Sequence, residues 1–206
     1  MKISTSSGFM ALACATMLAL GACSPLGVAT GAGATVGIAA AGEGGISGAA
    51  TDVRIRTQIN ESWFRHDVDM FRKVGLTVDQ GRVLLTGIVQ NPDHRVEAVR
   101  LVWQVEGVKQ VINEIRVDES AGFVSYANDA WISANMRTSM TFDRNILSIN
   151  YSIDTVDGTV YIMGVARDQA ELDRVIALAK NIRGVKQVVS YAKMLGEPIV
   201  SQAGQQ

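Results

Sequence analysis

Apolar residues recur at every fourth position in two stretches of the chain. The residues are Ile55, Ile59 and Trp63 in the first stretch, and Ile132, Met136 and Met140 in the second. This spacing places each triplet on one face of a helix, because a helix turns about 100° per residue. Each helix is therefore expected to bury its apolar stripe against a core.

A β-hairpin is predicted after each of these helices. In the second half, Asp157-Gly158 separates the segments Ile149–Val156 and Thr159–Ala166. Glycine accepts the left-handed backbone of a two-residue turn without strain, so the two segments are expected to pair. The corresponding turn and strands of the first half are Gln80-Gly81, Val74–Asp79 and Arg82–Val89.

A second helix is expected after each hairpin, with a polar cap at its start. Asn91 caps the first, with Pro92 at the first helical position, where a missing N–H costs nothing. Asp168 takes the same place in the second half and starts a capping-box pattern with Glu171. Two left-handed glycine caps and two final strands complete the pattern: Gly107 and Gly184, then Lys109–Val117 and Lys186–Met194.

The two halves are copies of one unit. Gly-Val-Lys-Gln-Val at residues 107–111 recurs at residues 184–188, a shift of 77 positions (184 − 107). Without any insertion, the same shift superimposes Asp52 on Asp129, Gly81 on Gly158, Val83 on Val160, Gly87 on Gly164 and Leu101 on Leu178. We interpret the glycines at 87 and 164 as bends or close backbone approaches, and count Gly87, Gly107, Gly164 and Gly184 as structural glycines.

Each copy reads α-β-β-α-β, which predicts an α+β fold of two tandem domains. Each domain would be a three-stranded mixed sheet packed on two helices. A unit of about 65 residues has a marginal core on its own, so the copies are expected to pack against each other. The predicted boundaries are 52–118 for the first domain, 119–128 for a linker, 129–195 for the second domain and 196–206 for a tail.

The N-terminus predicts a lipoprotein precursor. The uncharged apolar run Phe9–Leu20 suits a signal-peptide h-region and is too short to span a bilayer. It ends in Leu20-Gly21-Ala22-Cys23, which resembles the bacterial lipobox. Residues 1–22 are then a signal peptide, and Cys23 carries diacylglycerol and an N-acyl chain such as palmitate. A plain secretory signal with a chance cysteine is the alternative. By resemblance to enterobacterial lipoproteins, Ser24 favours the outer membrane.

Residues 23–51 are predicted to form a Gly/Ala-rich tether. Residues 24–42 carry no charge. Each glycine weakens a helix by about 0.8–1 kcal/mol, which favours a flexible coil. The alternative is a membrane helix with small residues four apart, such as Gly27 and Gly31.

Composition excludes several functions. The chain has 19 basic and 20 acidic side chains, and loss of Lys2 with the signal leaves a formal charge of −2. That balance argues against a nucleic-acid partner. Cys14 leaves with the signal, so no disulfide is expected. With only His66 and His94, and no nucleophile–base pattern, we expect no metal, no cofactor and no catalysis.

The repeat resembles the BON domain, named for bacterial osmotic-shock and nodulation proteins. The matching segments, each followed by a helix and Gly-Val-Lys-Gln-Val, are Val83-Leu84-Leu85-Thr86-Gly87 and Val160-Tyr161-Ile162-Met163-Gly164. With the lipobox and tether, the chain resembles the dual BON-domain outer-membrane lipoproteins of Gram-negative bacteria. The resemblance implies a non-enzymatic protein on the periplasmic face of the outer membrane. It also implies that the second BON domain binds anionic phospholipid, and that the protein supports envelope integrity, responds to envelope stress and acts at cell-division sites.

Trp131 is the centre of the candidate phospholipid site. It lies about 140° from the centre of the buried stripe, and its equivalent in the first copy is Arg54. Tryptophan favours the headgroup level of a bilayer. The predicted site adds Ala134, Arg137 and Thr138, with Arg137 as the main headgroup partner. The alternative is that Trp131 packs against the first copy or covers the seam between the two copies.

A different function remains open at this point. A periplasmic adaptor would use the BON sheets to bind proteins of an outer-membrane assembly, a cell-wall machine or the division site. Binding to anionic liposomes that weakens with salt would favour the lipid hypothesis over the adaptor.

Overall fold

The computed structural model describes residues 45–118 and 126–202. The predictions for the signal peptide, for Cys23 and for most of the tether fall outside these residues.

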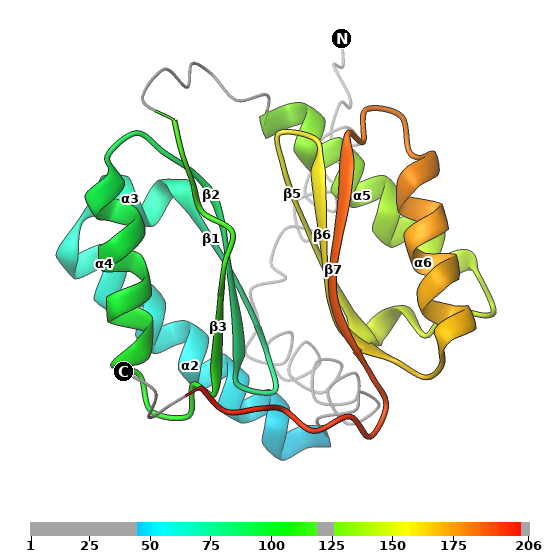
Figure 1. Ribbon diagram of the computed structural model, residues 1–206, viewed down its shortest axis with the longest axis horizontal. Coiled ribbons are helices and arrows are strands. Elements are labelled where there is room, and N and C mark those ends of the chain that lie inside the picture. The colour runs from blue at the N-terminus through cyan, green and yellow to red at the C-terminus, as the bar shows by residue number, and fades with distance from the viewer. Residues whose placement is uncertain (1–44, 119–125, 203–206) are drawn as a thin grey trace, which may run out of the picture. The chain divides into compact units, whose positions relative to one another are not determined.

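The first copy contains three helices and four strands among the described residues (Figure 1). In chain order they are α2 (Gly45–His66), α3 (Val68–Lys73), β1 (Val74–Asp79), β2 (Arg82–Val89), α4 (Pro92–Trp103), β3 (Gln110–Asn113) and β4 (Arg116–Val117). Strand β2 pairs antiparallel with β1 and parallel with β3 and β4. The predicted final strand is therefore present but interrupted around Ile115, which turns into the core.

The second copy repeats this order. Its elements are α5 (Tyr126–Phe142), the 3-10 turn η1 (Ser148–Asn150), β5 (Tyr151–Val156), β6 (Thr159–Ala166), α6 (Gln169–Asn181) and β7 (Gln187–Met194). Strand β6 pairs antiparallel with β5 and parallel with β7. The mixed sheet and the α+β fold are confirmed. Strand β5 begins two residues later than predicted, because η1 occupies Ile149 and its neighbours.

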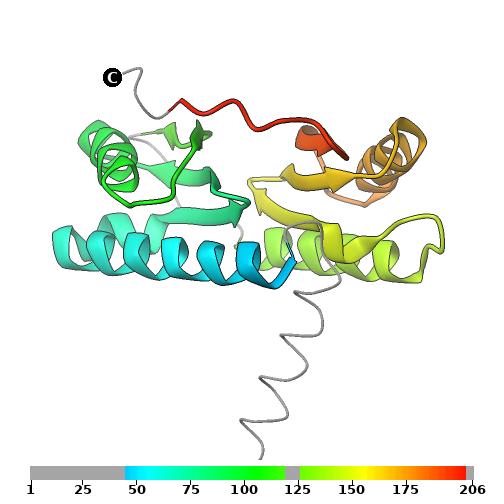
Figure 2. The same ribbon diagram turned by 90° about the horizontal axis from the view of Figure 1, so that it is seen from below.

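The helices of each copy cover one face of its sheet (Figure 2). The six residues of the two predicted apolar stripes are all buried. Trp63 also donates its indole N–H to the Ala98 carbonyl at 3.2 Å. Its predicted role as a core residue is confirmed.

The two sheets pack against each other through their other faces. Leu84, Tyr161 and Met163 form a separate buried cluster there. The Tyr191 hydroxyl donates to the Glu114 carboxylate, and Arg82 Nη2 donates to the Tyr191 carbonyl oxygen at 2.7 Å. The expectation that the copies pack together is confirmed.

The predicted close approaches at Gly87 and Gly164 are confirmed. Their φ angles are +123° and +140°. A Cβ on Gly87 would lie 2.2 Å from the Lys73 carbonyl oxygen, and one on Gly164 would lie 2.0 Å from the Asn150 carbonyl oxygen. Only glycine fits at either position.

The prediction that Gly107 and Gly184 cap helices was wrong. Helix α4 ends at Trp103 and α6 ends at Asn181, and the C-cap residues are Gln104 and Ile182. An extra turn follows each helix before the strand begins. The two glycines do adopt left-handed backbone, with φ of +97° and +89°, but they use it at the entry to the last strand.

Two helices begin earlier than the predicted boundaries. Helix α2 starts at Gly45, so residues 45–51, expected as tether coil, are helical. Good helix formers such as Ala49 and Ala50 extend the helix outward from its buried stripe. Helix α5 starts at Tyr126, inside the predicted linker.

Helix α3 was not predicted, and its cap explains why it occurs in one copy only. The Asp67 carboxylate accepts a hydrogen bond from Met70 N at 2.7 Å, and Met70 is buried. The second copy has Arg144 in place of Asp67. An arginine has no acceptor with which to cap a helix, so the segment stays a loop.

In each copy, one aspartate of the first helix fixes the hairpin turn to that helix. Asp52 accepts hydrogen bonds from Gln80 N and Gly81 N at 2.7 and 2.9 Å. Asp129 accepts from Asp157 N and Gly158 N at 2.7 and 2.8 Å. The repeat pointed to these aspartates as equivalent positions, but not to this contact.

Candidate functional site

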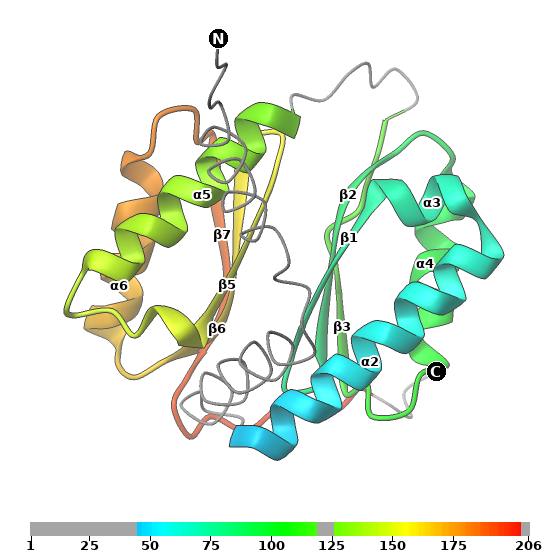
Figure 3. The ribbon, with the colours of Figure 1, turned by 180° about the vertical axis from the view of Figure 1, so that it is seen from behind.

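Trp131 lies on the exposed side of α5, as the helical geometry predicts. Its side chain is 47% exposed, while the neighbouring stripe of α5 is buried. Helices α2 and α5 both lie on the outer faces of their sheets (Figure 3). Trp131 is therefore not a buried residue, and it does not belong to the cluster between the two sheets.

The face of α5 around Trp131 presents little polarity. Ala134 and Thr138 are exposed beside it. The Thr138 hydroxyl donates to the Ala134 carbonyl oxygen at 2.9 Å, and Asn135 Nδ2 donates to the Trp131 carbonyl oxygen at 2.9 Å. Each side chain thus satisfies a donor within the helix, which lowers the cost of removing this face from water.

Arg137 is less available than predicted. Its backbone lies on the exposed side of α5, but Nη2 donates to the Ile153 carbonyl oxygen of β5 at 2.6 Å. Its other guanidinium donors have no hydrogen-bond partner among residues 45–118 and 126–202. Arg137 therefore makes a structural contact with β5 in addition to any contact at the surface.

Helix α2 of the first copy provides an internal comparison. Arg54 occupies the position of Trp131, and Glu61 that of Thr138. Arg54 pairs with Glu106 at 3.7 Å, and Glu61 pairs with Arg65 at 2.5 Å. The same helix thus presents charges in one copy and an uncharged aromatic face in the other.

Sequence reasoning missed Phe142, the last residue of α5. It is 82% exposed. Eleven positions at about 100° each bring it within roughly 20° of Trp131 around the helix, and Arg65 is its equivalent in the first copy. Applying the wheel used for Trp131 to the end of the helix would have found it.

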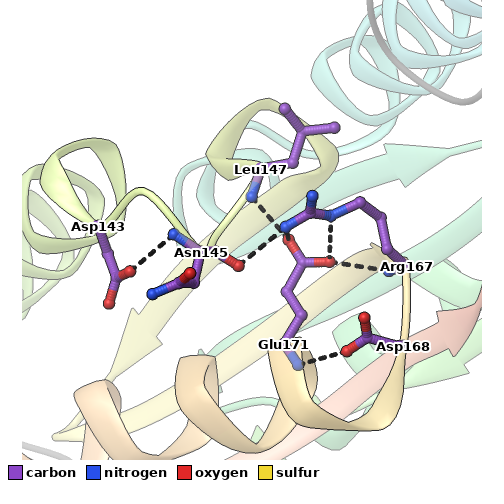
Figure 4. A network of polar contacts seen from close by, with 6 residues as sticks. All are labelled: Asp143, Asn145, Leu147, Arg167, Asp168 and Glu171. Atoms are coloured by element: carbon purple, nitrogen blue, oxygen red, sulfur yellow. Dashed lines mark hydrogen bonds and ion pairs between the residues drawn. The ribbon is translucent and has the colours of Figure 1, made fainter.

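A network of hydrogen bonds holds the loop between α5 and β5 (Figure 4). Glu171 is only 3% exposed, and its carboxylate accepts from Leu147 N at 2.6 Å and from Arg167 N at 2.8 Å. Arg167 Nη2 donates to the Asn145 carbonyl oxygen at 2.8 Å. Asn145 N in turn donates to Asp143 at 2.9 Å.

Glu171 also forms an ion pair with Arg167, at 3.0 Å between Nε and Oε2. Burial alone raises the pKa of Glu171, but the Arg167 side chain and the two backbone donors outweigh it and lower the pKa. The predicted capping box is half correct. Asp168 accepts a hydrogen bond from Glu171 N at 2.8 Å. The Glu171 carboxylate, however, accepts from Leu147 N of the loop and not from the Asp168 N–H.

The remaining singled-out residues have structural surroundings. Trp103 is half-buried and packs on the first core. His66 is exposed, and His94 is partly buried 3.8 Å from Asp67. Within residues 45–118 and 126–202, no group of His, Cys, Asp and Glu side chains could hold a metal ion. No helix in that part of the chain is both long and apolar enough to cross a bilayer.

Comparison with known proteins identifies the repeat. Residues 51–119 and 128–195 each match the BON domain. Together these segments cover more than half of the chain.

Three relatives illustrate the range of similar proteins. An uncharacterized protein from the gshII 5′ region of Anaplasma centrale is 44% identical over 144 residues, which are 69% of this chain and 94% of that protein. The outer membrane lipoprotein DolP of Haemophilus influenzae is 31% identical over 115 residues, 56% of this chain and 59% of that protein. The osmotically-inducible protein Y of Escherichia coli is 30% identical over 144 residues, 69% of this chain and 72% of that protein.

Proposed function

Since this chain belongs to the BON domain family, and its relatives include an outer membrane lipoprotein, we propose that it is an envelope protein that binds anionic phospholipid through α5 of its second BON domain. Trp131 is the central contact, with Ala134 and Thr138 beside it. The protein is non-enzymatic, needs no cofactor, and supports the integrity of the envelope, including at division sites.

One observation carries this proposal. Trp131 is 47% exposed on an uncharged helix face, whereas the same position of the first copy is an arginine in an ion pair. The contrast between the copies shows that the fold itself does not require an aromatic residue at this position. The indole ring suits the headgroup level of a bilayer, where its apolar body and its N–H are both satisfied.

Local charge supports an anionic lipid over a neutral one. The predicted mature chain is slightly acidic, so the whole molecule has no general attraction to a negative membrane. Arg137 and Arg144 are, however, exposed basic residues, one within α5 and one directly after it. Each basic group close to an anionic surface contributes about 1 kcal/mol.

Trp131→Glu tests the proposal on residues 23–206 with Cys23→Ser, which lacks the acyl anchor. We expect at least tenfold weaker binding to vesicles containing phosphatidylglycerol, because the change removes an apolar contact and adds repulsion. The thermal midpoint should change little, because exposed substitutions usually cost within about 0.5 kcal/mol.

Val53→Glu is the matched control, because Val53 is an exposed apolar residue of α2. It should bind vesicles like the parent chain. If the parent chain ignores anionic vesicles, the proposal is wrong, and the adaptor function gains support if an envelope protein is then captured in its place.

We further propose that Cys23 carries the lipid that holds the chain on the periplasmic face of the outer membrane. The relative named as an outer membrane lipoprotein supports this location. The lipid on Cys23 and the contact through α5 would then act as two attachments to the same envelope.

A further inference from the structure

The connection between α5 and β5 exposes three large apolar side chains. Phe142 is 82% exposed, Ile149 is 43% exposed and Leu147 is 37% exposed. Isolated exposed apolar residues are ordinary, but several within one short segment indicate an interaction surface. None of the three belongs to the predicted site around Trp131.

The first copy shows that the fold does not require these apolar residues. Arg65 stands in place of Phe142, and Arg72 in place of Ile149. Met70, the equivalent of Leu147, is a buried residue of α3. At these three positions, exposed apolar residues are thus found only in the second copy, which also carries Trp131. The first copy exposes Phe64 and Val68 at other positions of its corresponding segment.

The loop backbone is fixed with its polar groups satisfied. Leu147 N and Asn145 N donate to carboxylates, and the Asn145 carbonyl oxygen accepts from Arg167. Figure 4 shows the Leu147 side chain on the side away from Glu171. A loop held in this way can enter a poorly hydrated interface with several of its backbone groups already paired, and without a large ordering cost.

A basic side chain stands among the apolar ones. Arg144 is exposed and makes no hydrogen bond or ion pair with any other residue that the structure describes. It lines a hollow of about 410 Å³ together with Arg167 and Arg174. The nearby carboxylates are already engaged: Glu171 with Arg167, Asp143 with Arg174 at 3.3 Å, and Asp168 with Glu171 N at 2.8 Å. Arg144 is therefore the guanidinium free to bind a phosphate.

We propose that residues 142–150 form a second membrane-contacting element, in which Phe142, Leu147 and Ile149 enter the bilayer interface and Arg144 binds a lipid phosphate. This inference rests on the proposed function and extends it to a new segment. The apolar residues suit the acyl-chain boundary of an anionic membrane, and the neighbouring Arg144 suits its headgroup layer. The segment is also continuous with the α5 face, because Phe142 lies on the same side of the helix as Trp131.

Phe142→Gln with Ile149→Gln tests the apolar part in residues 23–206 carrying Cys23→Ser. Leu147 is left unchanged, because at 37% it is the least exposed of the three. We expect binding to phosphatidylglycerol-containing vesicles to weaken by at least tenfold, with no change in charge. Val53→Gln with Val96→Gln removes two equally exposed apolar side chains of the first copy and should bind like the parent.

A fluorescent probe locates the loop directly. The sequence has two cysteines, Cys14 and Cys23. Residues 23–206 carrying Cys23→Ser therefore contain no cysteine, and Ile149→Cys gives a single labelling site. A polarity-sensitive dye there should shift to the blue with anionic vesicles, while one at Val96→Cys should not. No shift at position 149, with vesicle binding that still depends on Trp131, overturns this inference and leaves the proposed function intact. A shift produced by raising protein concentration alone would assign the surface to a second copy of the chain.

Arg144→Gln tests the phosphate contact and its source. Binding to anionic vesicles should fall about fivefold, the contribution of one basic group at such a surface. Arg56→Gln, on an exposed arginine of α2, is the control. Inorganic phosphate at millimolar concentration should not raise the thermal midpoint of the parent chain. If it does, and Arg144→Gln binds vesicles normally, the site binds free phosphate and the lipid assignment is overturned.

Discussion

At Gly87 and Gly164, a missing side chain lets the second strand of each hairpin bend against the segment before the first strand. Each glycine has a positive φ, and each lies directly against a carbonyl oxygen of the chain. Two separate causes thus exclude every other residue there. This is why the same glycine recurs in both copies.

Gly87→Val and Gly164→Val should each destabilise the fold. The backbone strain alone costs about 1–3 kcal/mol, and the clash with a carbonyl oxygen adds to it. We expect each thermal midpoint to fall by roughly 5–10 °C, measured by circular dichroism. Gly48→Val is the control, because a Cβ there would meet nothing within 4 Å. Unchanged midpoints for both strand variants would contradict this account.

At the scale of elements, an aspartate in each first helix clamps the following hairpin. Asp129 accepts two backbone N–H groups of the turn at 2.7 and 2.8 Å. Hydrogen bonds to a charged acceptor are stronger than neutral ones, and the turn N–H groups would otherwise lie partly buried and unpaired. The contact therefore fixes the register of helix and hairpin together.

Asp129→Ala should lower the free energy of unfolding by about 2–3 kcal/mol. Denaturant titration measures this loss. Asp173→Ala removes an exposed carboxylate of α6 that bonds only to Gln169 among the contacts described, and should cost within about 0.5 kcal/mol. Equal losses in both variants would show that the clamp adds nothing.

The sequence predicted those elements whose cause is local. The stripe that includes Ile132 and the Asp157-Gly158 turn depend on spacing and backbone freedom, and both formed as expected. The missed features depend on distant partners. The Glu171 carboxylate does not complete the capping box, because it accepts a hydrogen bond from Leu147 N, 24 residues away in the chain. Helix α4 ends before Gly107, because one more turn of the chain connects it to the sheet. For the candidate site, the helical wheel predicted the exposure of Trp131 but not the capture of Arg137 by the edge of β5.

At the scale of the whole molecule, the two domains meet through equivalent positions. Leu84 and Tyr161 correspond in the repeat, and both lie in the cluster between the sheets. Glu114 and Tyr191 also correspond, and they hydrogen-bond to each other. The contact thus approximates a twofold axis between the copies.

This contact should make stability sensitive to alkali. Burial, followed by the bond to the Glu114 carboxylate, raises the pKa of Tyr191 to about 12. A tyrosine whose pKa is raised on folding stabilises the fold at pH values below its unfolded-state pKa, which is near 10. That contribution is lost as the pH rises from about 10 to 12. Tyr191→Phe should lower stability at pH 8 and flatten its decline above pH 10. Denaturant titrations at pH 8, 10 and 11 measure both, and an unchanged alkaline slope would contradict the assignment.

Attachment of the whole molecule should depend on Cys23. We expect Cys23→Ser to yield an unprocessed or soluble form in place of a membrane-bound one. Only a thiol accepts the diacylglyceryl group, with which it forms a thioether. Labelling cells with a clickable palmitate measures the modification. Equal labelling of the variant and the parent would refute the lipobox interpretation.

The near-twofold contact between the sheets is the arrangement by which two identical subunits form a homodimer. In a homodimer, every surface residue appears twice, so a tryptophan at the position of Trp131 would be presented by both subunits. Joining the subunits into one chain removes this constraint, because each half then mutates independently. The chain accordingly has arginine at residue 54 and tryptophan at residue 131. Its aromatic helix face is monovalent, so contact through that face gains no avidity from its own other half.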